Sequence, residues 1–295
     1  AGSIDVLAEE NATAPAGVTR GLPNKANVLA ALEAAITAST QGDRVVFYFS
    51  GHGAQTPDLD GDEGGGMDEI FLPRDAKGWN GGIGAVENAI GDDELSRFTR
   101  MAAERGVAVI AILDACHSGT GFRDGPQDHA RARYIAPAAL GIPQAQLSDQ
   151  GTPQDAPPGD NVFLYAAQSD QRAFEYPIGP ESRWHGDFTR ALTEVLLEVP
   201  DLSYAGLVQA ATARMKTVSG QAVQTPDVEG PMADTAVFGG DGPGLTRMAV
   251  ARGRAWRVRT TRCKSMTASD CCARNACMAA VMVARNRAHA PRHAD

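Results

Sequence analysis

Two stretches of the chain are apolar at almost every position and rich in β-branched residues. They cover residues 44–49 and 107–113, and a glycine-containing turn follows each. Unbroken apolar runs of this length are typical of strands buried on both faces of a parallel sheet. Shorter apolar runs predict further strands at residues 4–8, 70–72, 161–167 and 235–238.

Other segments carry apolar residues at the three- and four-residue spacing of amphipathic helices. They cover residues 25–37, 92–105, 187–199 and 203–218. Asn24 is placed to cap the first of these helices, and acidic residues open the second, as the helix dipole favours. Strands that alternate with helices predict an α/β fold with a mainly parallel sheet and helices on both faces.

Composition divides the chain into a body and a tail. Residues 1–244 hold 16 basic and 34 acidic residues, whereas residues 245–295 hold 11 basic and 2 acidic ones. We expect one domain at residues 1–240 and a basic, disordered tail at 241–295. Within the domain, residues 125–160 lack periodicity and predict an exposed linker loop between a larger segment (1–124) and a smaller one (161–240).

The charge balance also narrows the range of partners. An acidic body does not favour nucleic acid, and it fits cationic substrates or a bound divalent cation. No apolar stretch reaches the length of a membrane span, and no charged-then-apolar leader opens the sequence. We therefore expect a cytoplasmic monomer that does not bind membranes.

A histidine and a cysteine follow the two long apolar runs. His52 lies in Ser-Gly-His-Gly (residues 50–53), and Cys116 lies in Asp-Ala-Cys-His-Ser-Gly (residues 114–119). Carboxyl ends of parallel strands are where α/β proteins build their sites. Each residue alone is often structural, but together they suggest a nucleophile and its proton acceptor. Cys116 is also the only cysteine of the body, which favours a free thiol.

The glycine after the histidine suggests how a reacting carbonyl would be held. Gly53 leaves room for close approach to its backbone N–H. That N–H and the amide of Cys116 are candidates for an oxyanion hole, which stabilises the negative oxygen formed during acyl transfer.

These two motifs resemble the paired signatures of the caspase-like cysteine peptidases (peptidase family C14), most closely the metacaspase and bacterial branch. The resemblance covers about residues 1–240 and implies a three-layer sandwich, with Cys116 as nucleophile and His52 as base. It also implies cleavage of protein or peptide substrates after Arg or Lys, with Asp114 and Ser50 lining the pocket. A carboxylate two residues before the nucleophile suits a guanidinium, although Asp114 could instead cap its strand.

The family's fold normally begins with an apolar inner strand that this sequence does not show. The sheet is therefore expected to lack that strand, which would leave unpaired backbone edges. A non-catalytic caspase-like interaction module remains an alternative function, as does a peptidase with a different side-chain preference, such as Asp.

The resemblance further implies an activating calcium ion. Its carboxylate ligands would be Asp68, Asp92, Asp93 and Asp124, since calcium takes six to eight oxygen ligands. Asp92 and Asp93 are equally suited to the first turn of a helix.

The linker contains residues that an Arg-directed peptidase could cut. Arg123, Arg131 and Arg133 lie in or beside it, so we expect self-cleavage between residues 120 and 160, unless these are ordinary surface charges. Asp170 and Glu175 follow the strand expected to border the pocket and could help to bind substrate.

Overall fold

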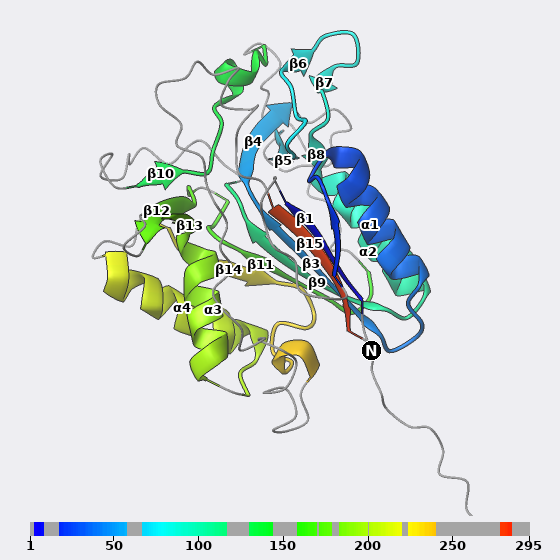
Figure 1. The fold of residues 1–295 in the computed structure, drawn as a ribbon, viewed down its shortest axis with the longest axis vertical. Coiled ribbons are helices and arrows are strands. Elements are labelled where there is room, and N and C mark those ends of the chain that lie inside the picture. The colour runs from blue at the N-terminus through cyan, green and yellow to red at the C-terminus, as the bar shows by residue number, and fades with distance from the viewer. Residues whose placement is uncertain are drawn as a thin grey trace, which may run out of the picture.

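The structure is a computed structural model. It describes residues 3–8, 18–57, 67–116, 130–143, 158–169, 171–178, 183–199, 201–219, 224–239 and 278–284. A seven-stranded sheet forms its centre, in the order β14-β11-β9-β3-β15-β1-β2 (Figure 1). These strands are β1 (Ile4–Ala8), β2 (Val18–Gly21), β3 (Arg44–Ser50), β9 (Ala108–Asp114), β11 (Asn161–Tyr165), β14 (Asp227–Glu229) and β15 (Met278–Ala284).

Two helical layers cover the sheet. On one face lie α1 (Lys25–Thr37) and α2 (Asp92–Glu104), and on the other α3 (Asp187–Glu198) and α4 (Tyr204–Ser219) (Figure 1). Successive side chains of a strand point to opposite faces, so β9 supplies both cores. Val109, Ala111 and Leu113 pack in the core beneath α1 and α2, and Ile110 packs in the core beneath α3 and α4.

Three smaller sheets extend this framework near the carboxyl end of β3 (Figure 1). They have the strand orders β4-β5-β8, β10-β12-β13 and β6-β7. Their strands are β4 (His52–Pro57), β5 (Met67–Leu72), β6 (Trp79–Asn80), β7 (Ala85–Val86), β8 (Ile90–Gly91), β10 (Arg131–Ala132), β12 (Phe174–Ile178) and β13 (Arg183–Gly186), and the 3-10 turns are η1 (Pro137–Leu140) and η3 (Val237–Gly239).

The predicted caspase-like α/β fold is confirmed, with a mixed sheet. Strand β3 is parallel to β9, and β9 to β11, whereas β14 and β15 run antiparallel to their neighbours. Helix α1 begins after Asn24, whose side chain accepts a hydrogen bond from the amide of Asn27 at 3.1 Å, as expected for a cap.

The expectation of a disordered tail is wrong for residues 278–284. These residues form β15, which lies between β3 and β1 and pairs with both (Figure 1). An apolar, strand-forming segment satisfies the backbone groups that a gap in the sheet would leave exposed. The predicted vacancy in the sheet is therefore filled, by a strand from the far end of the chain.

Two other expectations also need correction. Residues 235–238 form no strand; Ala236 makes a single bridge to Ser203, and Phe238 adopts a φ of 54°, outside the range of extended backbone. In the linker, residues 130–143 are not an exposed loop, because Arg133, Leu140 and Ile142 are buried.

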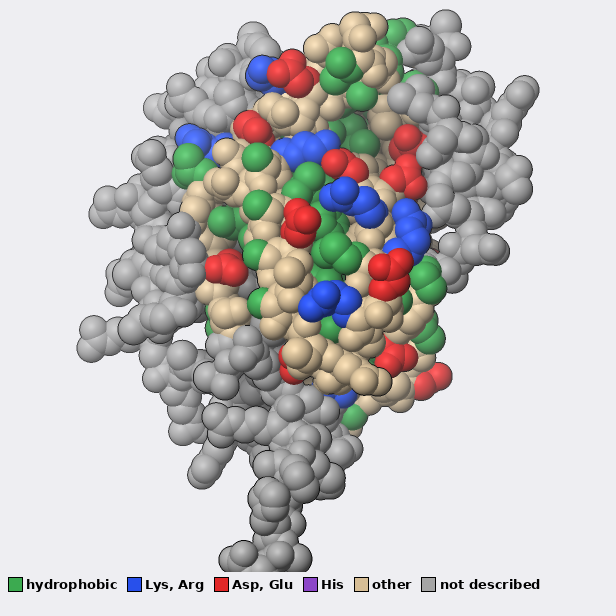
Figure 2. All heavy atoms as spheres, turned by 90° about the vertical axis from the view of Figure 1, so that its right-hand side faces the viewer, with side chains coloured by type: hydrophobic (Ala, Val, Ile, Leu, Met, Phe, Trp, Pro, Cys, Tyr) green, Lys and Arg blue, Asp and Glu red, His purple; other side chains and the backbone are tan. Residues whose placement is uncertain are grey.

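The outer surface of the α1–α2 layer mixes both signs of charge, with apolar side chains between them (Figure 2). Among the helices that the structure describes, none is long and apolar enough to cross a membrane.

Candidate active site

Strand pairing brings the two motifs together. Strands β3 and β9 are parallel neighbours, and Ser50 at the end of β3 pairs with Asp114 at the end of β9. His52 and Cys116 each lie two residues beyond this pair, so both lie at the same end of the sheet. The amide of Gly51 donates to the carbonyl of Asp114 at 3.2 Å and ties the two turns together.

Both side chains of the candidate dyad are uncharged in this environment. Burial, together with the charges of the nearby Arg133 and Arg131, lowers the pKa of His52 to about 3. Burial raises the pKa of Cys116 to about 12. The Cys116 thiol donates to the carbonyl of Ala173 at 3.2 Å and accepts from the amide of that residue at 2.9 Å. The imidazole Nδ1 of His52 has no hydrogen-bond partner within the described residues.

The two backbone amides predicted to form an oxyanion hole both donate to one backbone carbonyl oxygen of this same chain. The backbone N–H of Gly53 donates to the Arg133 carbonyl at 3.0 Å, and the N–H of Cys116 donates to the same oxygen at 3.3 Å. Glycine is required at position 53, because a Cβ there would lie 1.9 Å from the carbonyl oxygen of Cys116. Two converging N–H donors are the arrangement that stabilises a tetrahedral oxyanion.

The side chain of Arg133 occupies a buried acidic pocket. Its Nη1 donates to Ser50 Oγ at 2.7 Å and to the carbonyl of Asp114 at 2.8 Å. Its Nη2 lies 3.4 Å from Glu175 Oε2, and its Nε lies 3.9 Å from Asp114 Oδ1. Asp114 and Ser50, the two residues predicted to bind a basic substrate side chain, both contact the guanidinium of Arg133, and Glu175 adds a second carboxylate.

The Asp114 carboxylate is positioned by hydrogen bonds and by close packing against neighbouring residues. Its Oδ2 accepts from the amide of Thr189 at 3.2 Å and from the Thr189 hydroxyl. That hydroxyl also lies 2.9 Å from the hydroxyl of Tyr48. A Cβ at Gly186 would lie 2.0 Å from Asp114 Oδ2, so only glycine permits this approach.

The linker segment around Arg133 crosses the site in an extended conformation. Arg131 and Ala132 form β10, antiparallel to β12, and the amide of Arg133 donates to the carbonyl of Ala173 at 2.9 Å. Beyond Arg133, the amide of Ile135 donates to the carbonyl of Gly53 at 2.9 Å. Residues 131–135 are therefore bound by strand-like hydrogen bonds, as peptide ligands often are.

Strand β12, which pairs with this segment, is held in place by hydrogen bonds to the side chain of Gln224. The Gln224 carboxamide accepts from the amide of Phe174 at 2.6 Å and donates to the carbonyl of Ala166 at 2.9 Å. Because Gln224 is buried, these bonds join β12 firmly to the end of β11.

The predicted calcium ligands do not gather within the described residues. Asp92 and Asp93 lie in the first turn of α2 and Asp68 lies in β5, while Asp124 lies outside the described residues. Asp170, predicted to help bind substrate, also lies outside them. In the part of the chain that is described, no three His, Cys, Asp or Glu side chains are grouped so that they could hold a metal ion. Calcium binding therefore stays a prediction.

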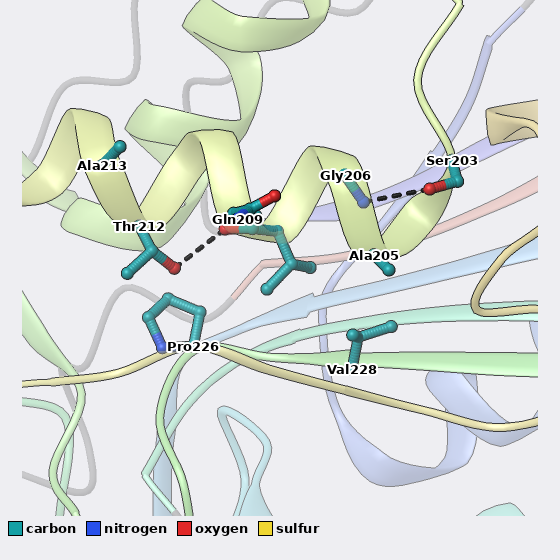
Figure 3. Close-up of a pocket in the computed structure, with 9 residues that line it drawn as sticks. Ser203, Ala205, Gly206, Gln209, Thr212, Ala213, Pro226 and Val228 are labelled. Atoms are coloured by element: carbon teal, nitrogen blue, oxygen red, sulfur yellow. Dashed lines mark hydrogen bonds between the residues drawn. The ribbon is translucent and has the colours of Figure 1, made fainter.

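A separate pocket lies beside α4, away from the dyad (Figure 3). The residues that line it include Ser203, Gly206, Gln209, Thr212, Pro226 and Val228. It contains none of the predicted site residues.

Several groups of the site were not singled out from the sequence. Thr189, Ala173 and Trp184 come from the smaller segment, more than 50 residues after Cys116. A threonine, an alanine and a tryptophan carry no catalytic pattern of their own. Only the pairing of β10 with β12 and the packing of α3 reveal their place.

A cysteine and a histidine lie at adjacent strand ends, on a sheet covered by helices on both faces, as the resemblance to the caspase-like cysteine peptidases implies. Residues 3–123 match the family model described as "Metacaspase, peptidase C14 domain". Metacaspase-1 of Emericella nidulans is 42% identical over 98 residues, which are 33% of this chain and 22% of that protein. Metacaspase-1 of Cryptococcus neoformans is 40% identical over 101 residues, 34% of this chain and 20% of that protein.

The segment that carries His52 and Cys116 is therefore similar to the metacaspase branch of the C14 peptidases. The chain spans about a fifth of the length of the curated relatives it matches. A solved structure, protein GSU0716 from Geobacter sulfurreducens, has a similar fold with a TM-score of 0.50 and 24% identity. That match covers 72% of this chain and 76% of the other.

Proposed function

We propose that this chain is a cysteine endopeptidase that cleaves proteins after arginine or lysine, with Cys116 as nucleophile and His52 as base. One observation carries the proposal. A single residue, Arg133, has its carbonyl between the amides of Gly53 and Cys116 and its guanidinium between Asp114 and Glu175. That is the position required of the residue before a cleaved bond.

The reaction follows from these groups. His52 removes the proton of the Cys116 thiol, and the thiolate attacks the substrate carbonyl carbon. The resulting oxyanion is held by the N–H groups of Gly53 and Cys116. His52 then gives the proton to the leaving amine as the C–N bond breaks, leaving a thioester. Water, activated by the neutral imidazole, hydrolyses the thioester and restores the thiol.

Charge in the pocket supports basic specificity. Asp114 is fully buried and the side chain of Glu175 is 16% exposed, and a cation is needed to compensate the two carboxylates. An acidic side chain would meet two carboxylates, so a preference for Asp is disfavoured. Capped tripeptides ending in Arg, Lys or Asp before a fluorogenic group test this order directly. Faster release after Asp would overturn it.

The same geometry supports the bond between Arg133 and Tyr134 as the site of self-cleavage. In the described structure the dyad is neutral and the Cys116 thiol is hydrogen-bonded to Ala173. We expect the purified chain to be cut after Arg133, and the Cys116→Ala variant to stay intact.

Intact-mass measurement over time tests the self-cleavage site. Arg133→Gln removes the pocket cation and should abolish this cut, whereas Arg133→Lys should slow it and keep its position. A chain that stays whole with every active-site side chain present would favour the non-catalytic interaction module.

We further propose that calcium activates the enzyme through Asp68, Asp92, Asp93 and Asp124. Cleavage of an Arg peptide, measured in EGTA and then with added calcium, tests this proposal. The Asp124→Asn variant should require more calcium than the wild type. Equal rates in EGTA and calcium would refute it.

A further inference from the structure

A second arginine of the linker is bound beside the pocket. Arg131 precedes Arg133 by two residues, so the two side chains leave the extended segment on the same face. The guanidinium carbon of Arg131 lies 3.7 Å from the centre of the Trp184 ring. A cation this close to the face of an indole is attracted by the electron-rich ring.

The hairpin that binds Arg133 also carries the contacts to Arg131. Strand β13 brings Trp184 opposite Pro177 of β12, and β12 pairs Glu175 with Arg131. Directly opposed side chains of an antiparallel pair lie on the same face, and diagonal neighbours remain within reach of long side chains. Glu175 therefore faces Arg131 across the pair and Arg133 on the diagonal.

Electrostatics agree with this placement. Burial raises the pKa of Glu175, and the charges of Arg133 and then Arg131 act in the opposite direction. One carboxylate thus lies near two guanidinium groups, which favours its charged form.

We propose that Trp184 and Glu175 form a second basic subsite, which binds the side chain of the third residue before the cleaved bond, two positions before the residue in the Asp114 pocket. The preferred substrates are then peptides of the pattern Arg-Xaa-Arg, cut after the second arginine. This inference rests on the proposed peptidase activity and names its substrate class. Arginine suits the subsite better than lysine, because a planar guanidinium can stack on the indole while keeping its edge for hydrogen bonds.

Capped tripeptides with a fluorogenic leaving group test the subsite, used with protein that has already cut itself. Arg-Ala-Arg and Gln-Ala-Arg differ only at the position bound by Trp184. The wild type should show a kcat/KM for the first peptide about two- to fivefold higher, the range of a cation–π contact at an exposed site. Trp184→Leu should bring the ratio close to one, and Trp184→Phe should keep part of it.

Tyr176→Leu is the matched control. Tyr176 lies on the same hairpin, next to Glu175, so its side chain leaves the opposite face of β12. This variant should keep the wild-type ratio. Cleavage of Gln-Ala-Arg serves as the internal reference, because a merely destabilised variant loses both peptides equally.

The possible outcomes distinguish failure of the subsite proposal from failure of the peptidase proposal on which it rests. If neither peptide is cut, the peptidase proposal fails. If both are cut and Trp184→Leu keeps the wild-type ratio, the subsite is refuted while the peptidase stands. Self-cleavage gives a second readout: Arg131→Gln should slow the cut after Arg133 two- to fivefold, and Arg131→Lys should slow it less.

Discussion

At the scale of single residues, the site is organised around one buried cation. Arg133 is 5% exposed and Asp114 is fully buried, and neither charge would be stable there alone. Removing one partner of a buried pair leaves the other uncompensated, which costs several kcal/mol. The linker arginine and the pocket carboxylates therefore stabilise each other in the described structure.

Glu175→Gln should reduce discrimination between arginine and lysine substrates. Glu175 meets only the outer nitrogen of the guanidinium, Nη2, while Ser50 and the Asp114 carbonyl bind the other terminal nitrogen. A lysine ammonium has no second arm to reach Glu175. We expect kcat/KM for an Arg peptide to fall about three- to tenfold and that for a Lys peptide to fall less than twofold, consistent with loss of a charge-assisted bond. Equal losses on both peptides would contradict this role.

The uncleaved enzyme should have an unreactive thiol. Burial raises the pKa of Cys116 to about 12, and only the thiolate is alkylated. In the His52→Gln chain, which lacks the base and should stay whole with Arg133 in place, iodoacetamide labelling of Cys116 should be slow at pH 7.5 and rise about tenfold per pH unit up to pH 10. Peptide-resolved mass spectrometry separates Cys116 from the tail cysteines, which serve as reference thiols. Labelling of Cys116 as fast as the tail cysteines at pH 7.5 would rule out a buried thiol.

At the scale of elements, periodicity predicted the helices and the buried parallel strands within one or two residues. Helix α2 was expected at 92–105 and spans Asp92–Glu104, and the strand expected at 107–113 is Ala108–Asp114. Strands β10 and β12 could not be predicted as a pair. A two-residue strand carries no pattern, and its pairing depends on where Arg133 binds.

Strand β15 was missed for a different reason. Its sequence, MAAVMVA, is apolar and was visible, but the arginine-rich surroundings argued for a tail. The segment becomes a strand because it lies between β3 and β1 and pairs with both of them. Sequence patterns describe a strand's own residues and not the space in a distant sheet.

Val281→Pro should strongly destabilise the protein. Val281 pairs with Phe47 of β3 and with Asp5 of β1, so β15 is a central strand at this position. Proline removes a backbone donor and is excluded from central strands, at a cost of about 3 kcal/mol or more. In the Cys116→Ala background the melting temperature should fall about 6–12 °C. Ala288→Pro, outside the described strand, is the control, and equal melting temperatures for both variants would show that β15 does not stabilise the sheet.

At the scale of the whole molecule, the linker couples the active site to overall stability. Residues 131–135 are hydrogen-bonded to Gly53, next to His52, and bring two arginines near the imidazole, so the uncleaved fold holds a histidine that resists protonation. An unfolded chain exposes the same imidazole to water, where its pKa is about 6.5. The two states therefore bind different numbers of protons over a defined range of pH.

This difference predicts how stability depends on pH. The folded pKa of His52, about 3, lies below the unfolded value, so the unfolded state binds more protons between these limits. Stability from this group is complete above about pH 6.5 and decreases as pH falls, by about 2 kcal/mol at pH 5. Burial has the opposite effect on Glu175 and Asp187, whose raised pKa values favour folding at low pH. The free energy of unfolding measured against pH therefore does not by itself show the contribution of His52.

Urea unfolding of Cys116→Ala and of His52→Gln/Cys116→Ala, each at pH 8 and pH 5, measures the contribution of His52 alone. The loss between the two pH values should be about 2 kcal/mol larger when His52 is present. Equal losses would mean that His52 is accessible to protons in the uncleaved protein, and that residues 131–135 do not close the site.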